Sequence, residues 1–201
     1  MHLLHLTSII ALAVAQDLPP ISNSPNFRIT ANFNSESPLS VAAQGWNLTT
    51  YHILPGNDYV VLTNNTGRIF YNNGTADDFS SHTSQIWSDG GTPPWPWGVN
   101  VAPTSAPDEE GRRNVYVTSG VATPGVEVAE WPGTVYYTTG TFYVCNSTLL
   151  YGPAIALYYK DKNQVTPKEC ANVELQAWCL NEGSGLEHPF ARNSTCYETT
   201  A

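Results

Sequence analysis

The carboxyl groups that could support hydrolysis are spread along the sequence without a pairing pattern. Glycoside hydrolysis uses two carboxyl groups on either side of the bond that breaks. Glu127 and Glu130 lie within a predicted apolar strand, but their spacing of three residues places them on opposite faces of that strand. The Gly-x-Ser-x-Gly motif that exposes a nucleophilic serine is absent. We therefore name no catalytic residue and favour a protein without enzymatic activity.

Residues 72–82, NNGTADDFSSH, collect several groups that can bind metal ions, and Asp77, Asp78 and His82 are the candidate ligands. A cation such as Ca²⁺ is usually bound by closely alternating oxygen ligands, as in Asp-x-Asp-x-Asp-Gly, and that pattern is absent. We interpret the segment as a turn followed by one helical turn, with Thr75 or Asp77 as the N-cap. We predict neither a metal site nor a cofactor.

The stretch GGTPPWPWG, residues 90–98, is the strongest candidate for ligand binding. Aromatic rings often dominate binding surfaces, and prolines restrict the backbone, which lowers the entropic cost of binding. Strand alternation places Trp97 on the same face as Val99, towards a core. Trp95 is therefore the main binding candidate, and Trp87 and Asp89 are the other two.

The chain begins with the pattern of a signal peptide, residues 1–15. Its apolar run ends in Ala13-Val14-Ala15, which fits a small-residue cleavage site before Gln16. The run is too short to span a membrane. We expect the mature protein to comprise residues 16–201 and to be secreted into the extracellular space.

All four cysteines lie in the last third of the chain. An even number of cysteines behind a signal peptide indicates disulfides, because the secretory pathway is oxidising. Three connectivities are possible, and we favour the pairing of sequence neighbours, Cys145 with Cys170 and Cys179 with Cys196. The cysteines include no Cys-x-x-Cys pair, which argues against zinc.

Asn-x-Ser/Thr sequons indicate N-glycosylation of a secreted chain. Asn64 and Asn73 are the best candidates, because both lie in turn-like stretches. The complete set is Asn47, Asn64, Asn73, Asn146 and Asn193. The net charge of −9 repels nucleic acid and anionic membranes. We exclude both as partners, keep carbohydrate or an extracellular protein, and assume a monomer.

Apolar and polar residues alternate along most of the chain, as in half-buried strands. In FRITANFN, for example, Phe27, Ile29 and Phe33 share one face. About ten short strands separated by turn signals predict an all-β, single-domain antiparallel β-sandwich with little helix, and a β-barrel is the alternative. We expect a core over residues 27–179, loops at 76–96 and 103–112, and a loosely held tail at 181–201.

An ordered set of short motifs resembles an uncharacterised family of small secreted proteins from ascomycete fungi, known only as a domain of unknown function. The resemblance covers roughly residues 27–179, and it implies an all-β extracellular domain without assigned catalytic residues. It rests on Phe27-x-Ile29, Gly45-Trp46, His52, Phe70 to Thr75, Gly120 and Gly125, Gly140 to Cys145, and Pro167-x-x-Cys170 to Leu175, closing on Cys179.

We therefore expect a secreted, disulfide-bonded glycoprotein that acts as an extracellular binding or interaction module, either effector-like or glycan-binding. The alternative is a small extracellular hydrolase that takes its acids from the loops 76–96 and 103–112. Arg112-Arg113 follows the second loop, and secretory proteases cut after such dibasic pairs. We favour the simpler interpretation of the pair as the charged start of a strand.

Overall fold

The computed structural model describes residues 19–131, 133–183 and 186–198, so the predicted signal peptide lies outside the described residues. Strands dominate the described part of the chain, and its two helices are short. The elements are β1 (Ile21–Ser24), β2 (Asn26–Asn32), α1 (Pro38–Ala43), β3 (Asn47–Leu54), β4 (Asn57–Thr63), β5 (Phe70–Asn73), α2 (Ala76–Ser80), β6 (Gln85–Gly90), β7 (Trp95–Val101), β8 (Arg113–Ser119), β9 (Val126–Val128), β10 (Thr134–Tyr137), β11 (Thr141–Leu149), β12 (Gly152–Lys160), β13 (Cys170–Asn172), β14 (Glu174–Leu180), β15 (Ala191–Arg192) and β16 (Ser194–Tyr197).

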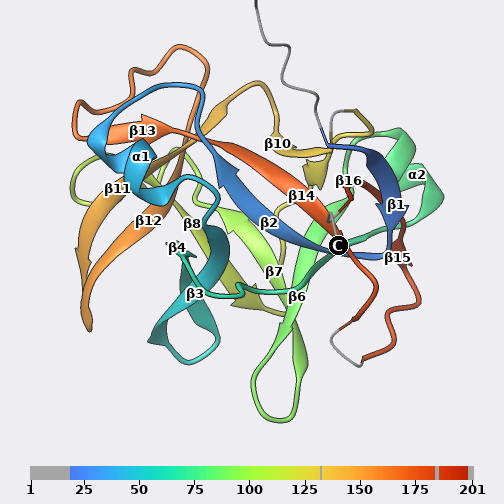
Figure 1. The fold of residues 1–201 in the computed structure, drawn as a ribbon. Coiled ribbons are helices and arrows are strands. Elements are labelled where there is room, and N and C mark those ends of the chain that lie inside the picture. The colour runs from blue at the N-terminus through green and yellow to red at the C-terminus, as the bar shows by residue number, and fades with distance from the viewer. Residues whose placement is uncertain (1–18, 132, 184–185, 199–201) are drawn as a thin grey trace, which may run out of the picture.

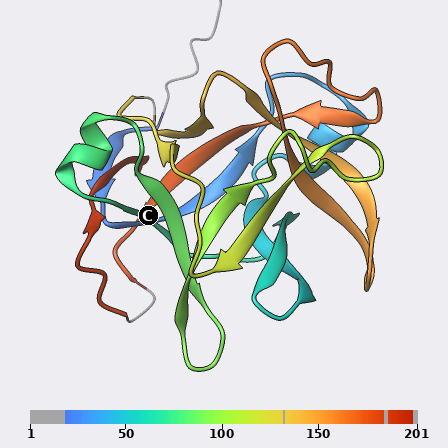
Figure 2. The ribbon, with the colours of Figure 1, turned by 180° about the vertical axis from the view of Figure 1, so that it is seen from behind.

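Eight antiparallel strands close into a barrel in the order β2-β3-β4-β12-β8-β7-β6-β5 (Figures 1 and 2). The barrel closes where Phe27 of β2 pairs with Phe70 of β5. The predicted all-β class with little helix is confirmed, and its architecture is the barrel that we named as the alternative to a sandwich. Both architectures bury alternate residues, so alternation alone does not show whether the first and last strands of a sheet pair.

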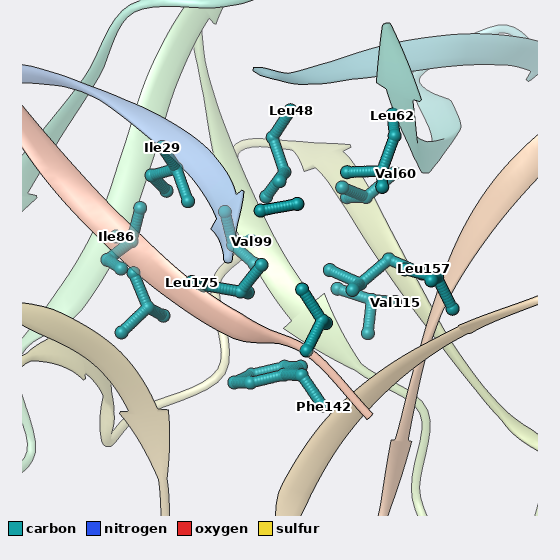
Figure 3. Packing of buried hydrophobic residues seen from close by; sticks show 14 of the residues in the cluster. Ile29, Leu48, Val60, Leu62, Ile86, Val99, Val115, Phe142, Leu157 and Leu175 are labelled. Carbon is teal, nitrogen blue, oxygen red and sulfur yellow. The ribbon is translucent and has the colours of Figure 1, made fainter. Parts of the chain in front are cut away.

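The barrel interior is filled with apolar side chains (Figure 3). Its residual cavity measures about 10 Å³, which is at the lower limit for a single water molecule. The largest fully buried apolar side chains in this cluster include Phe27, Phe70, Ile29 and Ile86. A ligand therefore has to bind on the outside of the barrel or at one of its ends.

Additional strands extend the barrel on two sides and carry both disulfides. β11 pairs with β12 and also with β13, and Cys145 joins Cys170 across this second pair. β14 pairs with β2 and with β16, and a disulfide joins Cys179 of β14 to Cys196 of β16. Both disulfides thus connect sequence neighbours, the connectivity that we favoured above.

The predicted loop 76–96 and the predicted tail 181–201 contain strands that were not expected. The segment 76–96 contains α2, which is the expected helical turn with Thr75 as its N-cap, and also strand β6; polar residues in β6 hide the alternation, although Ile86 and Ser88 both point inward and are fully buried. The tail 181–201 contains β15 against β5 and β16 against β1. Helix α1 was not predicted, because one short Pro-initiated turn gives no sustained helical period.

The predicted loop 103–112 is exposed along most of its length, and Arg112 anchors its end to the barrel. The Arg112 guanidinium binds Asp108 at 2.8 Å and Glu110 at 2.7 Å, and it lies 4.4 Å from the ring centroid of Tyr158 in β12. Arg113 is buried and binds Asp161 at 2.9 Å. Both side chains are engaged and β8 begins at Arg113, in agreement with the charged strand start.

Candidate functional site

The weak metal candidates are separated by the fold and engaged in other contacts. The Asp78 carboxylate caps α2 by accepting hydrogen bonds from the Thr75 amide and hydroxyl at 2.7 Å each, and these bonds lower the pKa of Asp78. Asp77 is exposed at the first turn of the same helix. Among the described residues, no group of three or more His, Cys, Asp or Glu side chains could hold a metal ion.

His82 instead contacts Glu127, which lies in strand β9. His82 Nδ1 lies 2.9 Å from Glu127 Oε1. The Glu127 carboxylate is almost fully buried and also accepts hydrogen bonds from the hydroxyls of Ser84 and Tyr136. Burial, reinforced by the bond to Glu127, raises the pKa of Tyr136. The protein itself satisfies the hydrogen-bonding capacity of this buried carboxylate. The same hydrogen bonds connect the segment that follows α2 to β9 and β10.

Asp89 is inaccessible to a ligand, contrary to its selection as a binding candidate. Its side chain is only 2% exposed, and His188 from the tail donates to it at 2.8 Å. The His188 ring stacks on Tyr71 of β5 with a centroid distance of 3.9 Å, and burial together with Asp89 raises the pKa of Tyr71. Trp87 is half-buried on the outside of β6. Sequence reasoning missed the contact between Asp89 and His188 because the two residues are 99 positions apart in the chain.

Trp95 and Trp97 lie at one end of the barrel and differ in exposure. Trp97 is half-buried and packs against the core, as strand alternation predicts. Trp95, at the start of β7, is 61% exposed. Figures 1 and 2 show that the β6–β7 and β3–β4 hairpins project from this same end. We define the Arg68 end of the barrel as Thr50, His52, Asp58, Arg68, Trp95 and Trp97.

Arg68 closes this end from the inside. Its Nε donates to Ser88 Oγ at 2.7 Å, its Nη1 to Thr50 Oγ1 at 2.7 Å, and its Nη2 to the Asp89 carbonyl at 2.9 Å. The guanidinium also lies 5.8 Å from the ring centroid of Trp97. Burial lowers the pKa of Arg68, and the nearby carboxylates of Asp58 and Asp89 partly offset this effect.

His52 and Asp58 form the polar rim beside Arg68. They face each other across β3 and β4, and His52 Nδ1 lies 3.0 Å from Asp58 Oδ1. The His52 side chain is 57% exposed, whereas that of Asp58 is 11% exposed. Sequence reasoning did not select Arg68, His52 or Asp58 as site residues, because each is an isolated polar residue in or beside an apolar strand.

The rim is continuous from the β3–β4 turn to Trp95. The amide of Ser119 donates to the Gly56 carbonyl at 2.9 Å, and the amide of Gly120 donates to the Pro96 carbonyl at 3.0 Å. The arrangement thus offers an exposed indole ring, an exposed imidazole and paired charges at one end of a closed barrel. Such a combination can stack on a sugar ring and hydrogen-bond to its hydroxyl groups.

The five sequon asparagines differ in accessibility. Asn64, Asn146 and Asn193 are exposed, whereas Asn47 and Asn73 are half-buried. The Asn47 Nδ2, which is the atom that would carry a glycan, donates to the Asn65 carbonyl at 2.8 Å. The folded structure therefore favours Asn64 over Asn47 as an acceptor.

Comparisons with known proteins give a family but no function. The family model described as a domain of unknown function (DUF7907) matches residues 24–179. The antigenic protein SchS34 of Stachybotrys chartarum is 28% identical over 203 aligned residues, which cover 92% of this chain and 91% of that protein. No solved structure matches the chain. Among the described residues, the helices are too short to cross a membrane.

Proposed function

We propose that this chain, which belongs to the DUF7907 family of domains of unknown function, is a secreted glycoprotein that binds carbohydrate at the Arg68 end of its barrel. The exposed ring of Trp95 beside the polar rim is the observation that carries this proposal. A filled interior supports a surface site, because no ligand can enter the barrel. The disulfides support an extracellular location, since disulfides persist in oxidising compartments.

A neutral glycan suits this end better than a charged one. The Arg68 guanidinium is held by Ser88, Thr50 and the Asp89 carbonyl and lies near the carboxylates of Asp58 and Asp89, so it is not free to bind an anionic ligand. Sugar hydroxyls can donate to the Asp58 carboxylate and accept from His52. The apolar face of the sugar ring can stack on Trp95.

The alternative, a hydrolase with acids from the loops 76–96 and 103–112, has less support. Asp78 caps a helix, Asp89 is buried under His188, and Asp108 binds Arg112. These carboxylates thus make separate structural contacts and do not converge on a common site. We do not propose hydrolysis.

A glycan array tests the binding proposal with secreted wild-type protein and two tryptophan variants. We expect Trp95→Ala to weaken binding about tenfold, since loss of an aromatic stacking contact typically costs more than 1 kcal/mol at a binding site. Trp131→Ala is the matched control, because Trp131 is 70% exposed but lies in the β9–β10 turn. Absence of glycan binding by the wild type, or equal binding by Trp95→Ala, would refute the proposal.

Secretion and modification are tested on protein recovered from the culture medium of a eukaryotic host. We expect an N-terminus at Gln16 and a reduction in mass after treatment with an endoglycosidase. Replacement of Asn64 by Gln should remove one glycan, whereas replacement of Asn47 by Gln should leave the mass of the glycans unchanged. Retention of residues 1–15 in the recovered protein would contradict the proposed signal peptide.

A further inference from the structure

A polar cavity of about 410 Å³ lies at the barrel end opposite Arg68. Strand directions fix this position: β2 ends and β3 begins beside the cavity, whereas β3 ends at the rim with His52. The volume falls within the range of about 300–1,000 Å³ that is typical of small-molecule sites. Its lining combines apolar side chains (Val135, Phe142 and Val173) with polar ones, which include Asn34, Ser35, Thr134, Thr141, Asn172 and Glu174.

Glu174, at the start of β14, supplies the charge of this cavity. Its Oε1 accepts hydrogen bonds from Gln176 Nε2 at 2.9 Å and from Asn32 Nδ2 at 3.4 Å. These neutral amides orient the carboxylate but do not neutralise it. Among the described residues, Glu174 forms no ion pair with a Lys or Arg side chain, and it is the sole charged residue in the cavity lining.

Tyr136 forms the wall beside Glu174 and lies between that residue and Glu127. The register that pairs Val135 with Leu175 places Tyr136 next to Glu174 on one face of the sheet. On its other side, Tyr136 is paired with Glu127 and bonded to that buried carboxylate. Two glutamates thus flank the same tyrosine across three adjacent strands, and the chain as a whole carries a net charge of −9.

We propose that this cavity binds a protonated amino sugar. The ammonium group would pair with Glu174, since a half-buried carboxylate that forms no ion pair with a Lys or Arg among the described residues can accept a charge-assisted bond. The ring hydroxyls would exchange hydrogen bonds with the amide and hydroxyl groups of Asn172, Thr134 and Thr141, which offer both donors and acceptors. This site is distinct from the Arg68 end, where a guanidinium lies near the carboxylates.

Calorimetric titration with a glucosamine trimer at slightly acidic pH tests the proposal on the full mature chain. We expect binding by the wild type and a loss of about tenfold or more in Glu174→Gln, because bonds to charged groups are the stronger class. Glu169→Gln is the matched control: Glu169 is exposed, does not line the cavity, and removes the same unit of charge. Thermal unfolding of each variant verifies that the fold is retained.

Two further probes identify the chemistry that the cavity recognises. The N-acetylglucosamine trimer lacks the ammonium group and should bind at least tenfold more weakly, whereas spermidine has ammonium groups but no hydroxyls and should also bind more weakly. Equal binding by either probe to the Trp95→Ala variant, no binding of the glucosamine trimer by the wild type, or unchanged binding by Glu174→Gln would overturn the proposal. Trp95→Ala should bind the glucosamine trimer normally, which separates this site from the one at the Arg68 end.

Discussion

The two ends of the barrel use their charged residues in different ways. At the Arg68 end, the guanidinium is bound to two hydroxyls and a carbonyl, and two nearby carboxylates offset its charge. At the opposite end, Glu174 is oriented by amides and lines a cavity that has no Lys or Arg among its described lining residues. In our proposals, the first arrangement stabilises the fold and leaves the rim for neutral ligands, whereas the second leaves a charge for a ligand to neutralise.

Alkaline pH should have the largest effect, because it acts on both ends at once. Burial raises the pKa of Tyr71 behind the Arg68 end and of Tyr136 beside the cavity, and it raises that of Tyr143 to about 12. A raised pKa in the folded state favours the neutral phenol, so this stability is fully present below pH 10 and is lost as the pH rises through the folded-state values. We expect cooperative unfolding above pH 10.

Tyrosinate absorbance and far-ultraviolet circular dichroism, recorded together during an alkaline titration, measure this effect. The buried tyrosines should ionise in the same pH range in which strand structure is lost. If most tyrosines ionise near pH 10 while the circular dichroism is unchanged, burial does not hold these phenols neutral. A loss of structure in two separate steps would show that the two ends unfold independently.

Replacement of Arg68 should have the next largest effect. Arg68→Met keeps much of the side-chain volume but leaves the hydroxyls of Ser88 and Thr50 without their donor. We expect a loss of about 2–4 kcal/mol in the free energy of unfolding, measured by urea denaturation. Glu174→Gln, at the other end, should lose less than about 1 kcal/mol, because Gln still accepts hydrogen bonds from the neighbouring amides.

Lys162→Met controls for the removal of a positive charge, since Lys162 is exposed on the β12–β13 loop. Its free energy of unfolding should change by no more than about 0.5 kcal/mol. Equal losses in Arg68→Met and Glu174→Gln would show that both ends are equally structural, and the contrast between them would then be wrong.

Two histidine contacts, His188 with Asp89 and His82 with Glu127, should contribute less to the free energy of unfolding and should differ from each other. His188→Ala removes the imidazole that binds the buried Asp89 carboxylate, and it removes the ring that stacks on Tyr71. We therefore expect a loss of about 2 kcal/mol in the free energy of unfolding. His82 is 73% exposed, and Glu127 keeps its bonds to Ser84 and Tyr136. His82→Ala should therefore lose less than about 1 kcal/mol.

His82→Gly gives a further control, because His82 has a φ of 56°, in the left-handed region that favours glycine. Its free energy of unfolding should be equal to or higher than that of His82→Ala, again by urea denaturation. A larger loss in His82→Ala than in His188→Ala would show that the Glu127 contact, and not the tail contact, is the stronger clamp.

Much of the fold was predictable, but the candidate sites were predictable only in part. Alternation found most of the strands and placed Trp97 towards the core with Val99. It missed β6, whose inward positions include the polar Ser88. Trp95 was found as an exposed ring, whereas Asp89 was selected although His188 buries it. A carboxylate has the same local sequence pattern whether or not a distant side chain covers it.

The sequence by itself determined the all-β class, because a period of two residues and the turn signals between strands are local properties. It also determined the net charge of −9, which follows from composition alone. The tertiary structure decided that the sheet closes into a barrel and that Arg68 fills one end. It also decided that Glu174 lines a cavity in which no other described lining residue is charged. Closure and charge balance depend on contacts between residues far apart in the chain, and local patterns carry no information about those contacts.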